Sequence, residues 1–104
     1  MNKELELEKI RAAIGEEVSV QEVLTLDDMF DDWLEQAMNA ANRTGEPPKA
    51  LLAIVRDTVV AAWRRRGDEG INSTSTGGQS YGYVDLQQDM AKRIIRANLR
   101  VFRP

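Results

Sequence analysis

The side chains best suited to chemistry are five carboxylates in the first third of the sequence. They are Asp27, Asp28, Asp31, Asp32 and Glu35. The chain has no histidine and no cysteine, so the usual nucleophile–base pairs and thiolate metal sites are absent. Acid–base work by carboxylates needs a low-dielectric pocket that raises a pKa, and the sequence indicates none. We therefore predict no catalytic site, no metal site and no cofactor. A small enzyme that uses this acidic cluster is the weakest interpretation.

Two structural interpretations of the acidic cluster stay open. Carboxylates in the first turn of a helix are favoured by the helix dipole, so the cluster is typical of a solvated helix start. It is equally typical of a counter-surface for a basic stripe on another subunit. The basic stripe has the helical spacing i, i+4, i+8 and i+11 and consists of Lys92, Arg96, Arg100 and Arg103.

The charge of the chain is polarised along its length. The net charge is −3, with −8 over residues 1–35 and +5 over residues 36–104. A protein that binds free DNA is expected to have a broadly basic surface, which this chain lacks. Polarised charge suits head-to-tail contacts between copies instead.

Apolar residues recur at the helical period in four segments. The first covers residues 2–14 and ends at Gly15, and the second begins at a capping signal at either Ser19 or Thr25 and reaches about residue 42. The third covers residues 48–66 and ends at Gly67, and its many apolar positions predict burial on more than one side. The fourth covers residues 86–101. Trp33 and Trp63 lie on the apolar stripes of the second and third segments and are expected in the core. We predict an all-α bundle of three main helices and a short N-terminal helix.

A segment without helical period separates the last two helices, at about residues 70–84. Gly77–Gly78 is a two-residue turn signal between stretches rich in Ser, Thr and Tyr, which predicts a β-hairpin. Only its base, at Ile71 and Val84, is apolar. An isolated hairpin is marginally stable in water, so we expect a projecting hairpin or loop that a partner orders. On composition alone, a flexible surface loop is the simpler interpretation.

Length and composition predict one domain, residues 1–104, in a soluble intracellular protein. No apolar run approaches the roughly 20 residues needed to span a bilayer, and the charged start lacks the apolar stretch of a signal peptide. The three arginines at residues 64–66 suit either a solvated helix end or a contact with acidic groups or phosphates.

The C-terminal half carries an ordered motif: a basic helix end, a Gly–acidic–Gly step, a Ser-rich turn, an aromatic residue and a basic helix. It reads Arg64-Arg65-Arg66-Gly67-Asp68-Glu69-Gly70-Ile71, then Ser73, Ser75, Gly77-Gly78, Ser80 and Tyr83. This order, with the chain length and the order of helices, resembles the head–tail connector (adaptor) proteins of tailed bacteriophages. The N-terminal half departs from any sharp pattern of that family.

The resemblance implies a structural role in virus assembly. Connectors of this type form a ring, typically twelve-fold, beneath the portal protein in the virion neck, after assembly in the host cytoplasm. They extend the channel through which packaged DNA passes without sequence-specific binding, and they dock the next neck or tail completion protein. The expected contact residues, besides the basic stripe and the acidic cluster, are Asn72, Thr74, Thr76, Gly77, Gly78, Gln79, Tyr81 and Tyr83. The alternative is a small nucleic-acid-binding module that uses the basic C-terminal helix.

Overall fold

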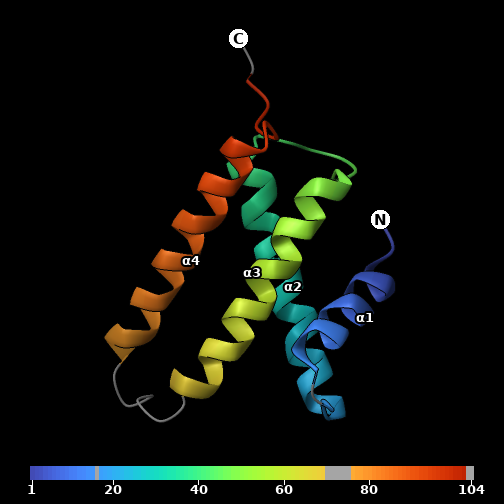
Figure 1. Cartoon of the computed structure of the whole chain (residues 1–104), viewed down its shortest axis with the longest axis vertical. Coiled ribbons are helices and arrows are strands. Elements are labelled where there is room, and N and C mark those ends of the chain that lie inside the picture. Colours follow the sequence, from blue (N-terminus) through green and yellow to red (C-terminus); the bar gives the residue numbers. More distant parts are fainter. Residues whose placement is uncertain (16, 70–75, 103–104) are drawn as a thin grey trace.

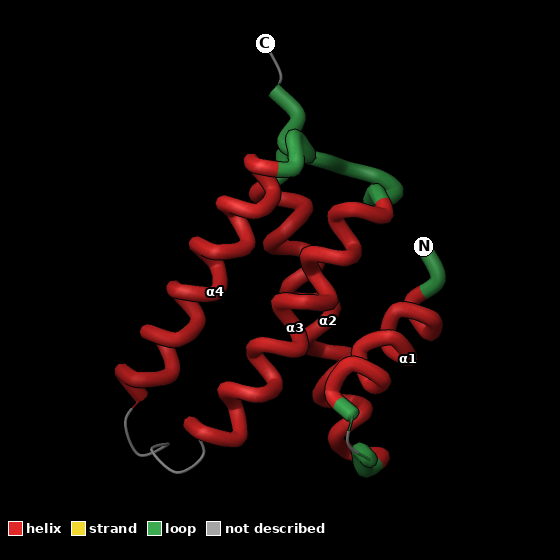
Figure 2. The backbone as a smooth tube through the Cα atoms, viewed as in Figure 1, coloured by secondary structure: helices red, strands yellow, loops and turns green. Residues whose placement is uncertain are grey.

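The computed structural model of the chain describes residues 1–15, 17–69 and 76–102, with the side chains of residues 66–83 outside this description. It contains four α-helices and, in these ranges, no strand (Figure 2). The helices are α1 (Lys3–Ile14), α2 (Val20–Ala40), α3 (Lys49–Glu69) and α4 (Thr76–Arg96). The all-helical bundle of three long helices and one short one is therefore confirmed.

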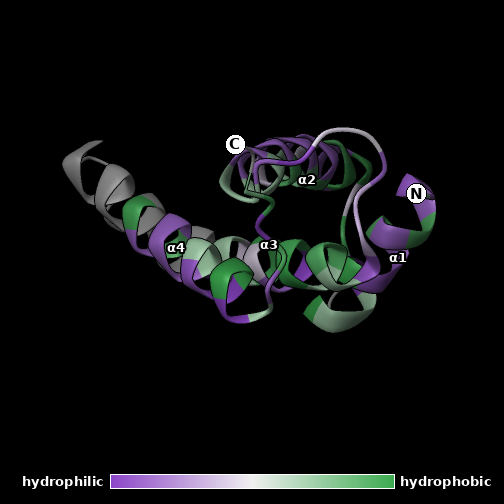
Figure 3. Cartoon of the chain, turned by 90° about the horizontal axis from the view of Figure 1, so that it is seen from above, coloured by the Kyte–Doolittle hydropathy of each residue, from purple (hydrophilic) through white to green (hydrophobic). Residues whose placement is uncertain are grey.

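Helix α3 is the centre of the bundle (Figure 1). Seen from above in Figure 3, α4, α3 and α1 lie in one row and α2 lies across them as a second layer. The molecule measures 46 × 31 × 18 Å, and its shortest dimension accommodates two layers of helices. Burial of α3 on more than one side, predicted from its many apolar positions, follows from its contacts with all three other helices.

The core is built from the predicted apolar stripes. Leu26, Phe30 and Trp33 of α2 are buried against α3, and Trp63 is buried on α3. Thr58 is a buried polar residue of α3, and its hydroxyl donates to the carbonyl of Ile54 at 2.9 Å. That bond satisfies the hydroxyl within the helix, which removes the penalty of burying it. The long helices thus bury their apolar side chains in a single core.

The ends of the first two helices follow local capping rules. Gly15 adopts the left-handed conformation at φ 76° and its amide donates to Arg11, so the predicted stop of α1 is confirmed. Ser19 forms a capping box with Glu22, which identifies Ser19 and not Thr25 as the start of α2.

The stops of α2 and α4 are made by asparagines. Asn42 and Asn98 have φ of 54° and 58°, and each is followed by a residue whose amide donates back to the third-last residue of the helix. These are Schellman motifs with asparagine in the place that glycine usually occupies. The predicted end of α2 at about residue 42 is close to the observed end at Ala40, whereas the prediction that carried α4 on to residue 101 is wrong, because α4 ends at Arg96.

The predicted β-hairpin is not found. Its turn at Gly77–Gly78 and the strand that follows lie in α4, which begins at Thr76, and its first strand lies outside the described residues. Helix α3 likewise continues beyond Gly67 to Glu69. The glycine turn signals are local preferences. A helix forms the hydrogen bonds of its own backbone and adds one bond for each further residue, so the helical conformation of α4 extends back to Thr76.

Candidate interaction surfaces

The acidic cluster lies on α2, and its members have different partners. Lys3 of α1 forms ion pairs with both Asp27 and Asp31. The hydrogen bonds that Lys3 donates to Asp27 and Asp31 hold the pKa of its ammonium above its ordinary value. These two carboxylates therefore join α1 to α2 within the chain and are committed to the fold.

The other three carboxylates of the cluster are exposed. Asp28, Asp32 and Glu35 have no ion pair or hydrogen bond within the described part of the chain. Asp32 and Glu35 border a hollow of about 410 Å³ on α2, whose walls also include Met29 and Trp33. Met29 is half-buried and Trp33 buried, so this hollow has an apolar floor and an acidic rim. We call it the α2 hollow.

The α2 hollow faces the α4 side of the bundle. Gln36, another of its lining residues, accepts a hydrogen bond of 2.6 Å from the side chain of Gln87 on α4. Asn39 completes the lining towards the C-terminal end of α2. The polar rim is thus held in place by a contact between two helices and not by the residues of α2 alone.

The predicted basic stripe is only partly a helical surface. Lys92 and Arg96 are exposed on α4 and have no ion pair among the described residues. Because α4 ends at Arg96, Arg100 lies in the segment after the helix, so one continuous stripe along a helix is wrong. Arg103 lies outside the described residues. The helical spacing was correct for two residues and was carried past a stop that the Asn98 motif imposes.

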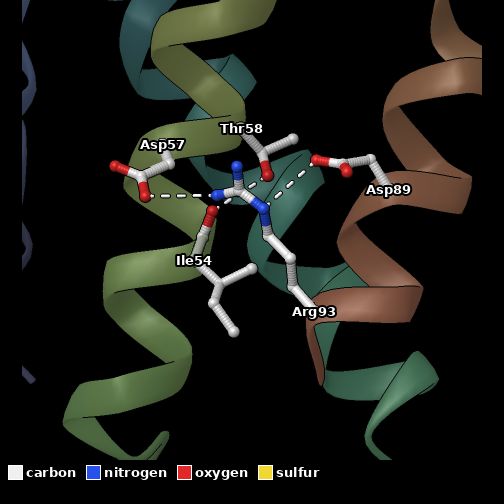
Figure 4. A network of polar contacts seen from close by, with 5 residues as sticks. All are labelled: Ile54, Asp57, Thr58, Asp89 and Arg93. Atoms are coloured by element: carbon white, nitrogen blue, oxygen red, sulfur yellow. Dashed lines mark hydrogen bonds and ion pairs between the residues drawn. The ribbon is translucent and has the colours of Figure 1, made fainter. Parts of the chain in front are cut away.

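Arg93, beside the stripe, joins α4 to α3 (Figure 4). Its guanidinium lies 3.2 Å from a carboxylate oxygen of Asp57 on α3 and 3.2 Å from one of Asp89 on its own helix. All three side chains are exposed, so solvent screens the interaction and its contribution to stability is small. The charge of Arg93 is therefore paired within its own molecule, unlike the charges of Lys92 and Arg96, which have no ion pair within the described residues.

The segment after α4 is tied to the end of α2. The amide of Val101 donates to the carbonyl of Ala41 at 2.7 Å, and the side chain of Asn42 donates to the carbonyl of Val101 at 2.9 Å. Arg43 donates to the carbonyl of Leu99 at 2.6 Å, and the Leu99 side chain is buried. This fixed segment, residues 97–102, runs beyond the helices at the C-terminal end in Figure 1.

The arginine run at the end of α3 is not uniform. Arg64 donates to the carbonyl of Ala13 at the end of α1, at 3.2 Å, and is otherwise exposed. Arg65 is exposed and has an interaction of its own, and the side chain of Arg66 is not described. One of the three therefore helps to hold α1, which the two sequence interpretations of a solvated end or a partner contact did not include.

The contact residues predicted on the hairpin cannot be assembled into one site. Asn72 and Thr74 lie outside the described residues. The others lie within α4, where only the backbone is described, and they are Thr76, Gly77, Gly78, Gln79, Tyr81 and Tyr83. Their backbone is helical, so they do not oppose one another in cross-strand pairs as a hairpin would place them.

A buried ion pair between α1 and α3 was missed by sequence reasoning. The guanidinium of Arg56 lies 2.5 Å from a carboxylate oxygen of Glu6, whose side chain is only 8% exposed. The signal was present: Glu6 stands four residues before the buried Ile10, and Arg56 stands four residues after the buried Leu52. Opposite charges at apolar positions of two helices are a pattern that identifies such pairs.

In the part of the chain that the structure describes, no three His, Cys, Asp or Glu side chains gather as a metal ion would require. None of the helices, as far as they are described, is long and apolar enough to cross a membrane.

Comparison with known proteins gives no relative. No protein-family model matches the sequence, and no curated protein or solved structure is significantly similar to the chain.

Proposed function

We propose that the chain is a structural subunit of a phage head–tail connector. The ordered motif of residues 64–83 and the order of helices carry the resemblance to that family. In this role the chain forms a ring under the portal protein in the virion neck, extends the DNA channel and docks the next neck or tail completion protein. The mechanism is binding and ring closure, with no reaction step.

The observation that supports the proposal most is the separation of opposite charges onto different helices. Asp28, Asp32 and Glu35 are exposed on α2, whereas Lys92 and Arg96 are exposed on α4. Heterologous contacts join two different surfaces of neighbouring copies and generate rings when the rotation closes. Complementary charge on the two surfaces favours that pairing and disfavours contacts between like surfaces.

A second support is the pair formed by α3 and α4. The two helices lie side by side, and α4 forms one edge of the bundle, as Figure 1 shows. The outward face of α4 supplies surface for contact with a neck protein, in place of the predicted hairpin.

The test is association with the portal protein encoded in the same genome. The purified chain is mixed with the assembled portal ring and centrifuged through a density gradient, and we expect the two to sediment together. The alternative, a nucleic-acid-binding module using Lys92 and Arg96, predicts instead that the chain binds a short DNA duplex with affinity that falls steeply with salt. Duplex binding without portal binding would replace the connector proposal with that alternative.

A further inference from the structure

The end of the described chain presents an aromatic side chain that the fold leaves outside. Phe102 is 81% exposed, and the guanidinium carbon of Arg100 lies 5.3 Å from the centre of its ring. An arginine at this distance from an aromatic ring is attracted to it. We call Arg100 and Phe102 the C-terminal anchor.

The C-terminal anchor is held in a set position. The residue between its two members, Val101, makes two hydrogen bonds with the end of α2, and the preceding Leu99 is buried and bonded to Arg43. A segment that is already ordered loses little conformational entropy when it binds, so more of its contact free energy appears as affinity. The backbone thus orders two side chains that contribute little to the core of their own molecule.

The α2 hollow has the properties that such an anchor requires. Its floor at Met29 and Trp33 is apolar, and its rim carries the exposed carboxylates of Asp32 and Glu35. The hollow, of about 410 Å³, is open to solvent, so a side chain of another molecule can reach it. Methionine in a binding surface adapts to aromatic groups and makes favourable contacts with them. An aromatic ring with a guanidinium beside it complements this hollow, because the ring suits the apolar floor and the cation suits the carboxylates.

We propose that the C-terminal anchor of one copy occupies the α2 hollow of a second copy. Phe102 does not fill the hollow of its own molecule, because its side chain is 81% exposed. In the complex the ring of Phe102 lies on Met29, and the guanidinium of Arg100 pairs with the carboxylates of Asp32 and Glu35. The complementary partner is thus supplied by the chain itself.

The geometry of this contact has a consequence for assembly. The anchor and the hollow are different surfaces, so the contact is heterologous, and a bound pair still offers one free anchor on one copy and one free hollow on the other. Repetition gives a ring if the rotation closes and a fibre if it does not. The ring form rests on the connector function proposed above, whereas the pairwise contact does not.

Two variants separate the halves of the contact. The anchor variant is Arg100→Glu with Phe102→Ala, and the hollow variant is Asp32→Lys with Glu35→Lys. All four side chains are exposed, and circular dichroism and urea unfolding verify that both variants fold. The matched control is Glu4→Lys with Glu8→Lys, which makes the same change of charge as the hollow variant at exposed positions of α1.

Sedimentation velocity over a concentration series, followed by native mass spectrometry, measures the association. We expect the wild type and the control to self-associate, and each variant alone to associate at least about tenfold more weakly, as for loss of a central interface residue. An equimolar mixture of the two variants should form a one-to-one dimer and nothing larger. One intact anchor then meets one intact hollow, and the other two half-sites are broken.

Three results would overturn the inference: a wild type that stays monomeric at every concentration, a variant that assembles like the wild type, or folded variants that fail to pair in the mixture. The portal experiment distinguishes this failure from that of the proposed function. If the chain binds the portal and both variants assemble like the wild type, the anchor contact is wrong and the connector proposal stands. If the two variants dimerise in the mixture and the wild type does not bind the portal, the anchor contact is supported and the connector proposal is wrong.

Discussion

Replacing Arg56 by alanine tests the energetic role of the buried ion pair that joins α1 to α3. The partner carboxylate of Glu6 is 8% exposed and has no other hydrogen bond or ion pair among the described residues. Removal of one member of a buried pair leaves an uncompensated charge and typically costs about 3–5 kcal/mol. The side chain of Arg56 is itself 24% exposed, so water has some access and we expect the lower end of that range, about 3 kcal/mol.

The reciprocal replacement, Glu6→Ala, should cost less. The long side chain of Arg56 is able to extend its guanidinium into water once Glu6 is gone, which avoids a buried charge. We expect the double replacement Glu6→Leu with Arg56→Met to lie close to the wild type, because apolar side chains of similar size substitute well for buried pairs. The wild type, Arg56→Ala, Glu6→Ala and the double replacement Glu6→Ala with Arg56→Ala form a double-mutant cycle, and the Glu6→Leu with Arg56→Met variant is measured beside it.

Urea unfolding monitored by tryptophan fluorescence measures the four free energies of unfolding, since Trp33 and Trp63 are both in the core. The two single replacements should be strongly non-additive. The reasoning would be refuted if Arg56→Ala cost less than about 1 kcal/mol, the scale of an exposed pair, or if the effects of the two alanine variants simply added.

Three further outcomes follow from the same structure. Asn98→Gly should leave the midpoint of urea unfolding unchanged or raise it, whereas Asn98→Ala should lower stability by roughly 1–2 kcal/mol, because the residue has φ of 58°. Gly82→Ala should raise the helix content seen by circular dichroism and add up to about 1 kcal/mol of stability, because residue 82 lies in α4; a loss of stability would contradict a helix there. The bonds of Lys3 raise its pKa above 10.5 in the folded state, so its stabilising effect is complete below that pH and is lost as the pH rises through the folded value. The stability difference between wild type and Lys3→Met, followed by urea unfolding from pH 7 to 11, should therefore be constant at first and shrink in alkali; a difference that grows with pH would contradict this.

Apolar period alone was sufficient to find the bundle. The stripe of Leu26, Phe30 and Trp33 is buried as predicted, and the capping box at Ser19 marks the start of α2. These features are local, and each is reinforced by burial of the same face. The excess of apolar positions on α3 likewise indicated a helix with neighbours on several sides.

Glycine signals misled where packing decides. Gly67 was read as a helix stop and Gly77–Gly78 as a hairpin turn, yet all three lie inside helices. A two-residue turn needs two strands to join, and the polar segments around it had no apolar face with which to form a sheet. The stops of α2 and α4 are made by Asn42 and Asn98, and each of these asparagines is preceded by an alanine.

The sequence identified the charged residues of the surface but not the ion pairs that they form. The five carboxylates and the basic stripe could be identified from the sequence. The sequence did not show that Lys3 forms ion pairs with Asp27 and Asp31. Such pairings join residues of different helices, and the apolar period says only which face of each helix is buried. The anchor formed by Arg100 and Phe102 was missed for a related reason, since α4 was carried past its stop at Asn98.

The mass of the complex with the portal ring tests the connector proposal most directly. Native mass spectrometry of the mixed and purified complex counts the copies of this 11.7 kDa chain on one portal ring. The account predicts that the added mass corresponds to one full ring of chains, with the same number in every complex and no partly filled rings at saturation. A portal ring that gains no mass, or that carries a variable number of independently bound chains, would contradict it.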